Sequence, residues 1–392
     1  MNSTIPLLYN VRSVRARWKS NLVAVLGIAG VVAVFIAMLA LARGFQRTLV
    51  DSGSPRNAIV MRGGASTEME SVVTLDQLRV ISDAPQVARD LRNRAMASGE
   101  VVVITAFRHK ASGADALAQV RGVTDMALEV HQGIRVAQGR FLRPGMAELV
   151  AGRNASDMYE GLKLGDRPRF GGLIWTVVGI LDAKGSAYDS EVWADNAVLN
   201  QTYKRPLDIF SSVTVRLTEP AALKGFQAAL AADPRLTVSA QRENEYYANQ
   251  SRMMTALIKV LGFLVAGVMG VGAVFGAFNT MYSAVSARSR EIATLRALGF
   301  GAGSVVIAFL LESLFIAFLG GVAGCMASLP LNGVTTSTLN WQSFSQIAFA
   351  FRITPGLLAE GVAFALFMGF WGGILPSFRA ARLPIAQALR EL

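Results

Sequence analysis

The chain has 392 residues, 52% of them hydrophobic, and its mean hydropathy is +0.40. Soluble globular domains rarely reach such a value, so the composition indicates a membrane protein. The formal net charge of +11 would suggest nucleic-acid binding in a soluble protein. Here much of the basic excess flanks apolar blocks, and we expect no nucleic-acid partner.

Residues 1–20 predict a basic cytoplasmic segment that carries Arg12, Arg15, Arg17 and Lys19. The block at residues 21–42 has no charged residue and is long enough for one transmembrane helix, which needs about 20 residues. Its apolar stretch exceeds the usual length of a signal-peptide core, and helical sequence continues to residue 50. We therefore expect a retained first span that extends outwards.

Residues 43–256 predict a large extracytoplasmic α/β domain. Strand and helix patterns alternate at 57–62, 74–82 and 100–107, and again at 211–217, 220–232 and 236–240. A β-rich lobe is expected between these two βαβ halves, at about residues 120–205, with its clearest strand at 175–181. Residues 243–254 look helical and should run directly into the second span.

Three further apolar blocks predict spans at residues 257–285, 304–328 and 355–378. Arginines cluster in the segments 286–303 and 379–392, which the positive-inside rule leaves in the cytoplasm. The loop 329–354 then lies outside. The expected fold is an α-helical membrane protein of four transmembrane helices, with the α/β domain inserted between the first two. Both termini are cytoplasmic.

No motif for catalysis or metal binding is present in the sequence. A P-loop ends in Gly-Lys followed by Ser or Thr, and this chain contains no Gly-Lys dipeptide. Its one cysteine, Cys325, lies in an apolar block, and its two histidines, His109 and His131, make no recognisable metal motif. We therefore expect neither catalytic residues nor a bound cofactor or metal.

Small residues mark faces on which the predicted spans can approach closely. They are Gly272, Gly276, Gly320, Gly321 and Gly324. Within the third span lies one ionisable residue, Glu312, about 12 Å from the expected start of the helix at 1.5 Å per residue. A charge at that depth is costly, so we expect it to face the bundle, either protonated or bonded to a neighbouring helix.

The segment 286–303 is short, basic and predicted to be helical. Ile292, Leu295 and Leu298 form a narrow apolar stripe, and Gly299 is placed to end the helix. Charged residues surround the stripe: Arg288, Arg290, Glu291 and Arg296. One interpretation is a helix lying in the membrane interface, and the other is a docking helix for a soluble partner.

Three motifs carry a family resemblance. REIATLRALGF at residues 290–300, PSFRAARLPIAQALREL at 376–392 and LVAGRNASDMYEGLKLGDRPRFGGLIWTVVG at 149–179 resemble permeases of the macrolide-exporter, lipoprotein-release and FtsX class of ABC transporters. One departure is Pro384 followed by Ile385, where the family usually has Asp-Pro. The resemblance implies a multi-pass protein of the bacterial inner membrane, with a MacB-like periplasmic core domain and an FtsX-like permease domain.

The same resemblance implies the partners. Such permeases dimerise, as homo- or heterodimers, and bind an ABC ATPase that carries ATP and Mg²⁺. We expect that ATPase to be a separate chain. The helix between spans two and three then couples ATP hydrolysis to mechanical motion outside, for efflux or for extraction of lipoproteins or lipids. A periplasmic adaptor or lipoprotein carrier is a further expected partner. The alternatives are an FtsX-like signalling scaffold that regulates a periplasmic partner and, less in keeping with four unbroken spans, a secondary transporter.

Overall fold

The computed structural model describes residues 18–384. Arg12, Arg15 and Arg17 of the predicted N-terminal segment, and residues 385–392 of the predicted tail, lie outside this range. The chain divides into two compact units. The helical unit contains the chain up to Arg43, residues 256–334 and the chain from Phe351, and the α/β unit contains residues 44–255 and 335–350.

Four helices of the described chain are long and apolar enough to cross a membrane. They are α2 (Trp18–Val50), α8 (Glu243–Ala287), α10 (Ala302–Ser328) and α11 (Pro355–Ala381). Thr354 caps α11 by accepting a hydrogen bond from the Leu357 backbone, and Pro355 occupies its first turn. Both α2 and α8 cross the division between the units without a break, so each helix contributes residues to both.

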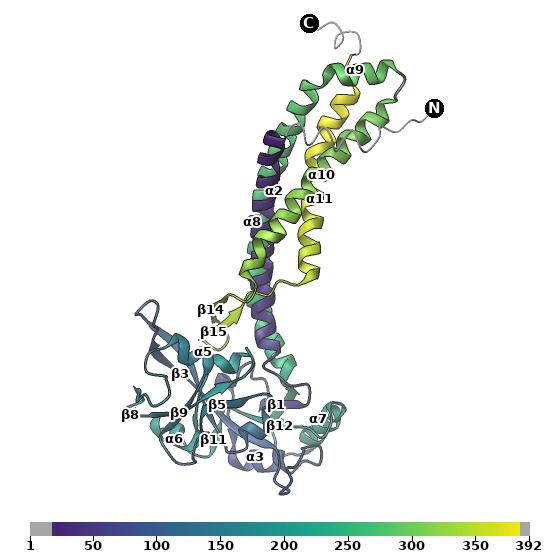
Figure 1. The fold of residues 1–392 in the computed structure, drawn as a ribbon. Helices are drawn as coiled ribbons and strands as arrows, with labels where there is room; N and C mark the ends of the chain where they lie inside the picture. The colour runs from purple at the N-terminus through teal and green to yellow at the C-terminus, as the bar shows by residue number, and fades with distance from the viewer. Residues whose placement is uncertain (1–17, 385–392) are drawn as a thin grey trace. The chain divides into compact units, whose positions relative to one another are not determined.

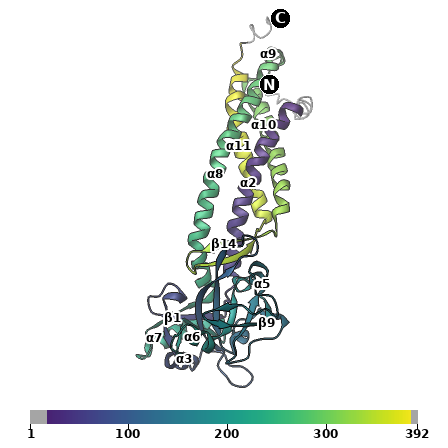
Figure 2. The same ribbon diagram turned by 90° about the vertical axis from the view of Figure 1, so that its left-hand side faces the viewer.

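Glycines let α10 approach its neighbours closely within the helical unit (Figures 1 and 2). A Cβ atom on Gly320 would stand 2.9 Å from the side chain of Ile28 on α2, and one on Gly321 would stand 2.8 Å from Ala365 on α11. At Gly324 it would stand 2.7 Å from a backbone oxygen of α2. These separations are shorter than carbon atoms tolerate, so any larger residue would push the helices apart.

Gly272 and Gly276 on α8 behave differently. A Cβ atom on either glycine would meet no atom of the described residues within 4 Å. Both positions are exposed, and Phe275 between them is 68% exposed. Among the described residues, packing inside the protomer therefore does not explain why these two positions are glycine.

The α/β unit is built on one nine-stranded sheet with the order β13-β1-β12-β3-β4-β10-β6-β9-β5. In chain order its strands are β1 (Asn57–Arg62), β3 (Ala97–Arg108), β4 (Asp115–Val123), β5 (Arg135–Gly139), β6 (Glu148–Gly152), β9 (Thr176–Asp182), β10 (Val192–Asp195), β12 (Ser212–Arg216) and β13 (Val238–Arg242). Short strand pairs join β2 (Val73–Thr74) to β11 (Ile209–Phe210) and β7 (Arg169–Phe170) to β8 (Leu173–Ile174).

Two strand–helix–strand segments form the first part of this sheet. In one, α3 (Leu75–Ser82) connects β1 to β3, and in the other α7 (Leu223–Ala232) connects β12 to β13. Strand β12 lies between β1 and β3, and strand β1 lies between β12 and β13, which is a split βαβ arrangement. Thr74 begins α3 with a capping box formed with Gln77, because each side chain bonds the other residue's backbone.

The sequence suggested a β-rich lobe at about residues 120–205, between these two segments. In the structure these residues do not form a separate lobe. Strand β3 has 12 residues. Its first part pairs with β12 and its second part pairs with β4, which continues the same sheet through β10. One long strand therefore belongs to both halves. The remaining helices of this part are short: α4 (Ala127–Val130), α5 (Arg153–Met158) and α6 (Asn196–Thr202).

Residues 335–350, expected to lie in a short loop, form a hairpin of β14 (Thr335–Asn340) and β15 (Ser345–Ala350). The hairpin is part of the α/β unit. The backbone N–H of Ala348 donates to Ser190 Oγ at 3.0 Å, and Phe349 packs edge-on against Phe45 with ring centroids 5.4 Å apart. The hairpin therefore returns the chain between α10 and α11 to the α/β unit.

Candidate functional site

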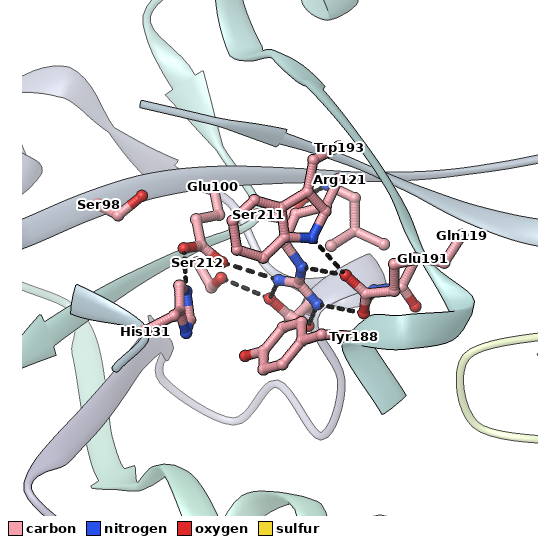
Figure 3. Close-up of polar contacts among 12 residues, drawn as sticks. Ser98, Glu100, Gln119, Arg121, His131, Tyr188, Glu191, Trp193, Ser211 and Ser212 are labelled. Carbon is pink, nitrogen blue, oxygen red and sulfur yellow. Dashed lines mark hydrogen bonds and ion pairs between the residues drawn. The ribbon is translucent and has the colours of Figure 1, made fainter. Parts of the chain in front are cut away.

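A buried arginine organises the centre of the α/β unit (Figure 3). Arg121 on β4 is 1% exposed. Its guanidinium nitrogens lie 2.8 Å from carboxylate oxygens of Glu68, Glu100 and Glu191. These glutamates come from the turn η1 (Glu68–Glu70), from β3 and from the residue before β10. The planar five-donor guanidinium can serve several carboxylates at fixed angles, so one side chain joins three segments.

His131 extends this network towards the start of α8. Its Nε2 lies 2.7 Å from Glu100, and its Nδ1 lies 3.2 Å from Glu243, at ion-pair distance but without hydrogen-bond geometry. Glu243 is the first residue of α8. Its carboxylate accepts hydrogen bonds from the Ser54 backbone, the Asn57 amide and the Tyr188 hydroxyl. The first residue of α8 is thus hydrogen-bonded to the segment 54–57 and to Tyr188, and it lies at ion-pair distance from His131.

The charges of this network are shielded from water. Tyr188 and Trp193 both pack against His131, and the Tyr188 ring centroid lies 5.5 Å from the Arg121 guanidinium carbon. Burial opposes the charged form of His131, but the carboxylates of Glu100 and Glu243 outweigh it and raise its pKa to about 10. For Glu100, burial is likewise outweighed by His131 and Arg121, which lower its pKa to about 2. Both groups are therefore charged at neutral pH.

Sequence reasoning missed this network. The signal was available, because Glu100 and Arg121 are single charged residues inside runs of apolar strand residues. Pairing them required the β3–β4 register, in which Val102 lies opposite Arg121. Ser212 also belongs to the network: its hydroxyl donates to Glu68 at 2.6 Å, and the same carboxylate is paired with Arg121. No group of three His, Cys, Asp or Glu side chains in the described chain is placed to hold a metal ion. The network holds three segments of the α/β unit together through buried ion pairs.

The second candidate site is the helix α9 (Ser289–Ala297), which follows α8 in the helical unit. Helix α8 ends at Ala287, and the Arg288 carbonyl accepts the first hydrogen bond of α9 from Ile292. At its C-terminus, the N–H groups of Gly299 and Phe300 bond to the carbonyls of Arg296 and Leu295. Gly299 adopts a φ of +97°, so its predicted role in ending the helix agrees with this Schellman geometry.

The predicted residues of α9 divide between two faces. Arg288 and Ile292 are buried, and Arg296 donates to the backbone oxygens of Ala381 and Leu383. Exposed residues form the other face: Arg290, Glu291, Thr294, Ala297 and Leu298. The apolar stripe expected from the sequence is therefore split, because Ile292 points into the bundle, Leu295 is half-buried and Leu298 is 73% exposed.

Glu312 on α10 was expected to be either protonated or bonded to a neighbouring helix, and the structure gives it a partner at the start of α9. Its carboxylate lies 2.9 Å from Arg288, and both side chains are buried. The sequence placed Arg288 among the charges around a docking stripe, but the structure turns it inwards. Arg288 also donates to Glu291 at 3.2 Å, and its guanidinium carbon lies 5.4 Å from the Phe309 ring centroid.

Two family models match the chain. One, the MacB-like periplasmic core domain, covers residues 22–233, and the other, the FtsX-like permease C-terminal domain, covers residues 263–385. Among similar curated proteins, the macrolide export ATP-binding/permease protein MacB of Hyphomonas neptunium is 23% identical over 97% of this chain and 60% of its own length. The pyoverdine export ATP-binding/permease protein PvdT of Pseudomonas entomophila is 26% identical over 97% of this chain and 59% of its own.

The chain thus spans about 60% of the length of these curated relatives. The ABC transporter permease YknZ of Bacillus subtilis is 28% identical over a shorter stretch, 35% of this chain and 32% of YknZ. The crystal structure of the YknZ extracellular domain matches with a TM-score of 0.37 and 13% identity, over 47% of this chain and all of that domain.

We predict that His131→Gln destabilises the α/β unit in a pH-dependent way. Removing one partner of a buried pair costs about 3–5 kcal/mol. His131 stabilises the folded state through its raised pKa: this contribution is complete below the unfolded-state pKa of 6.5 and is lost as pH rises through about 10. Glu100 stabilises the folded state through its lowered pKa, and this contribution is present above 4.5. The loss of stability in the variant should be largest between pH 4.5 and pH 6.5 and should shrink towards pH 10. Urea unfolding of the full chain in detergent, followed by tryptophan fluorescence, measures it. A pH-independent deficit would contradict the ion pair.

Proposed function

The chain belongs to the MacB/FtsX family of ABC-transporter permeases, and from this premise we propose that it transmits ATP-driven motion from a partner ATPase to its extracytoplasmic α/β unit. ATP and Mg²⁺ bind to that ATPase, which we propose is a separate chain, and this chain binds no cofactor of its own. The observation that carries the proposal is the two-faced α9: one face is held by α10 and α11, and the other presents Leu298 among charged residues. An exposed leucine within a charged rim has the character of a docking anchor.

We propose that this motion is transmitted along the continuous helix α8. Helix α8 is one helix of 45 residues, and it starts at Glu243 in the buried network and ends one residue before Arg288. We propose that a displacement of α9 moves α8 along with it and so pulls on Glu243. Because Glu243 is bonded to the Ser54 backbone, Asn57 and Tyr188, the α/β unit then rearranges around that point.

We propose export, or extraction of a substrate from the periplasmic side, as the work performed. The names of MacB and PvdT, both export proteins, support this over the alternative of an FtsX-like scaffold that regulates a periplasmic partner. A periplasmic adaptor or lipoprotein carrier would receive the substrate. The protein would lie in the inner membrane among lipids, with both termini in the cytoplasm.

The docking role of α9 predicts a loss of ATPase binding when its anchors are truncated. Leu295→Ala combined with Leu298→Ala should weaken binding by more than about tenfold, because removing a buried interface anchor costs about 2 kcal/mol or more. The measurement is co-purification of the ATPase, followed by ATPase activity in nanodiscs. Leu311→Ala is the control, since Leu311 is an exposed leucine of the apolar α10.

Glu291→Lys on the same face should impair coupling as well. A helix that only lies on lipid predicts the opposite, because added positive charge would strengthen its contact with anionic lipid and ATPase binding would not change. Wild-type binding and turnover in the double leucine variant would remove the docking role.

Dimerisation is predicted to use the open face of α8. Gly272→Leu with Gly276→Leu should reduce dimer recovery in detergent without changing protomer stability, because a Cβ atom at either position would meet no described atom within 4 Å. Gly324→Leu is the contrasting variant. It should lower the melting temperature, because the new side chain would collide with α2. Full dimer recovery in the double variant would assign the face to lipid.

Topology can be tested by thiol labelling after Cys325→Ser. A cysteine at Ser112, exposed in the turn between β3 and β4, should react with a membrane-impermeant reagent in intact spheroplasts. A cysteine at Ala297, exposed on α9, should react only after the membrane is opened. The expectation follows from the arginines at the ends of the spans. Labelling of position 297 from outside would invert the proposed orientation.

A further inference from the structure

The ion pair between Arg288 and Glu312 lies well inside the helical unit. Glu312 stands ten residues after the first residue of α10, which is about 15 Å along the axis at 1.5 Å per residue. The side chains of Arg288 and Glu312 are 6% and 4% exposed. Burying two charges is costly, and an apolar pair of the same volume would often be as stable. Stability alone therefore gives little reason for the pair.

The pair is one of three attachments on a single face of α9. Residues 288, 292 and 296 are spaced four apart and so lie along one side of the helix. Arg288 reaches α10, Ile292 packs with residues of α8 and α10, and Arg296 donates to Ala381 at the end of α11. The helix is thereby joined to all three of its neighbours.

The three attachments differ in what they resist. The Ile292 contact is apolar and non-directional, so it tolerates sliding. The two Arg296 bonds go to backbone oxygens near the end of α11. The Arg288–Glu312 bond is charged, directional and desolvated, and any separation would break a buried ion pair. It is the attachment that most strongly opposes a shift of α9 against α10.

We propose that Arg288 and Glu312 are positioning residues for coupling: they lock α9 to α10, so that displacement of α9 by the ATPase moves α10 instead of being lost at the junction. The inference rests on the proposed docking of an ATPase to the exposed face of α9. Arg288 also donates to Glu291 on that face, so the same guanidinium connects the docking surface to the bundle interior.

The test uses the full chain with the ATPase that co-purifies with it, reconstituted in nanodiscs. The main variant is Arg288→Gln with Glu312→Gln, which removes both charges and leaves no lone ion buried. ATPase binding should stay within about twofold of wild type, whereas permease-stimulated ATP turnover should fall by about fivefold or more, the size expected when coupled neighbours are separated.

A distance measurement separates positioning from simple destabilisation. Spin labels at Thr294 on α9 and Ile307 on α10, both exposed, are introduced after Cys325→Ser and accepted only if the ATPase still binds. In the wild-type background we expect one narrow distance distribution, unchanged between the nucleotide-free state and the state trapped with ATP and vanadate. In the double glutamine variant it should broaden or shift on trapping.

Two further variants complete the design. Arg288→Lys keeps the charge but loses the forked guanidinium that reaches both Glu291 and Glu312, so it should show the same uncoupling in weaker form and serves if the double variant does not fold. Glu360→Gln is the matched control. It removes a carboxylate from α11 that pairs with Arg43 at 2.7 Å, but Glu360 is half-exposed and distant in sequence from α9. It should behave as wild type.

The outcomes distinguish this inference from the function on which it rests. If no ATPase binds the wild-type chain, the proposed function fails and the inference fails with it. If the ATPase binds, but the folded double variant or Arg288→Lys keeps wild-type turnover and an unchanged distance distribution, only the positioning role is overturned. Loss of ATPase binding in a folded double variant would also contradict it, because the pair would then belong to the docking surface.

Discussion

A charge that is removed from water must find a partner, and α8 has a buried charge at each of its ends. Glu243 begins the helix within ion-pair distance of His131, and Arg288, directly after the last residue of α8, pairs with Glu312. Each pair excludes the many nearby arrangements in which its charges would be unpaired. Each end of the helix is thereby held by a directional contact with a specific charged partner.

The middle of the same helix has no such restraint. Between its ends α8 exposes a largely apolar surface that contains Gly272 and Gly276. By contrast, Gly320, Gly321 and Gly324 bring α10 into close contact with α2 and α11. Helix α8 is nevertheless packed against its neighbours, because a Cβ atom on Gly372 of α11 would stand 2.8 Å from Ala277 and one on Gly262 would stand 3.0 Å from Met38 of α2.

In the α/β unit, the charges around Arg121 have a comparable role. Three glutamates from separate segments share one guanidinium, and His131 links them to Glu243. A shift of Glu243 would have to break charged, desolvated bonds or move their partners with it. One of these partners, Glu100, lies on β3, the strand that joins both halves of the sheet.

The sequence by itself determined the features that depend on local pattern. Four apolar stretches have the length of the observed helices, Thr74 and Thr354 cap helices with their own side chains, and Gly299 ends α9 with a positive φ. Such features follow from hydrophobic length, turn chemistry and the freedom of glycine, all of which act within a few residues. Only the tertiary structure decided that the β-rich residues share one sheet, that Arg288 points inwards to Glu312 while Leu298 points outwards, and that Arg121 gathers Glu68, Glu100 and Glu191. The bonds of Arg121 to Glu100 and to Glu191 join residues 21 and 70 positions apart, and no local periodicity specifies the partner of a buried charge.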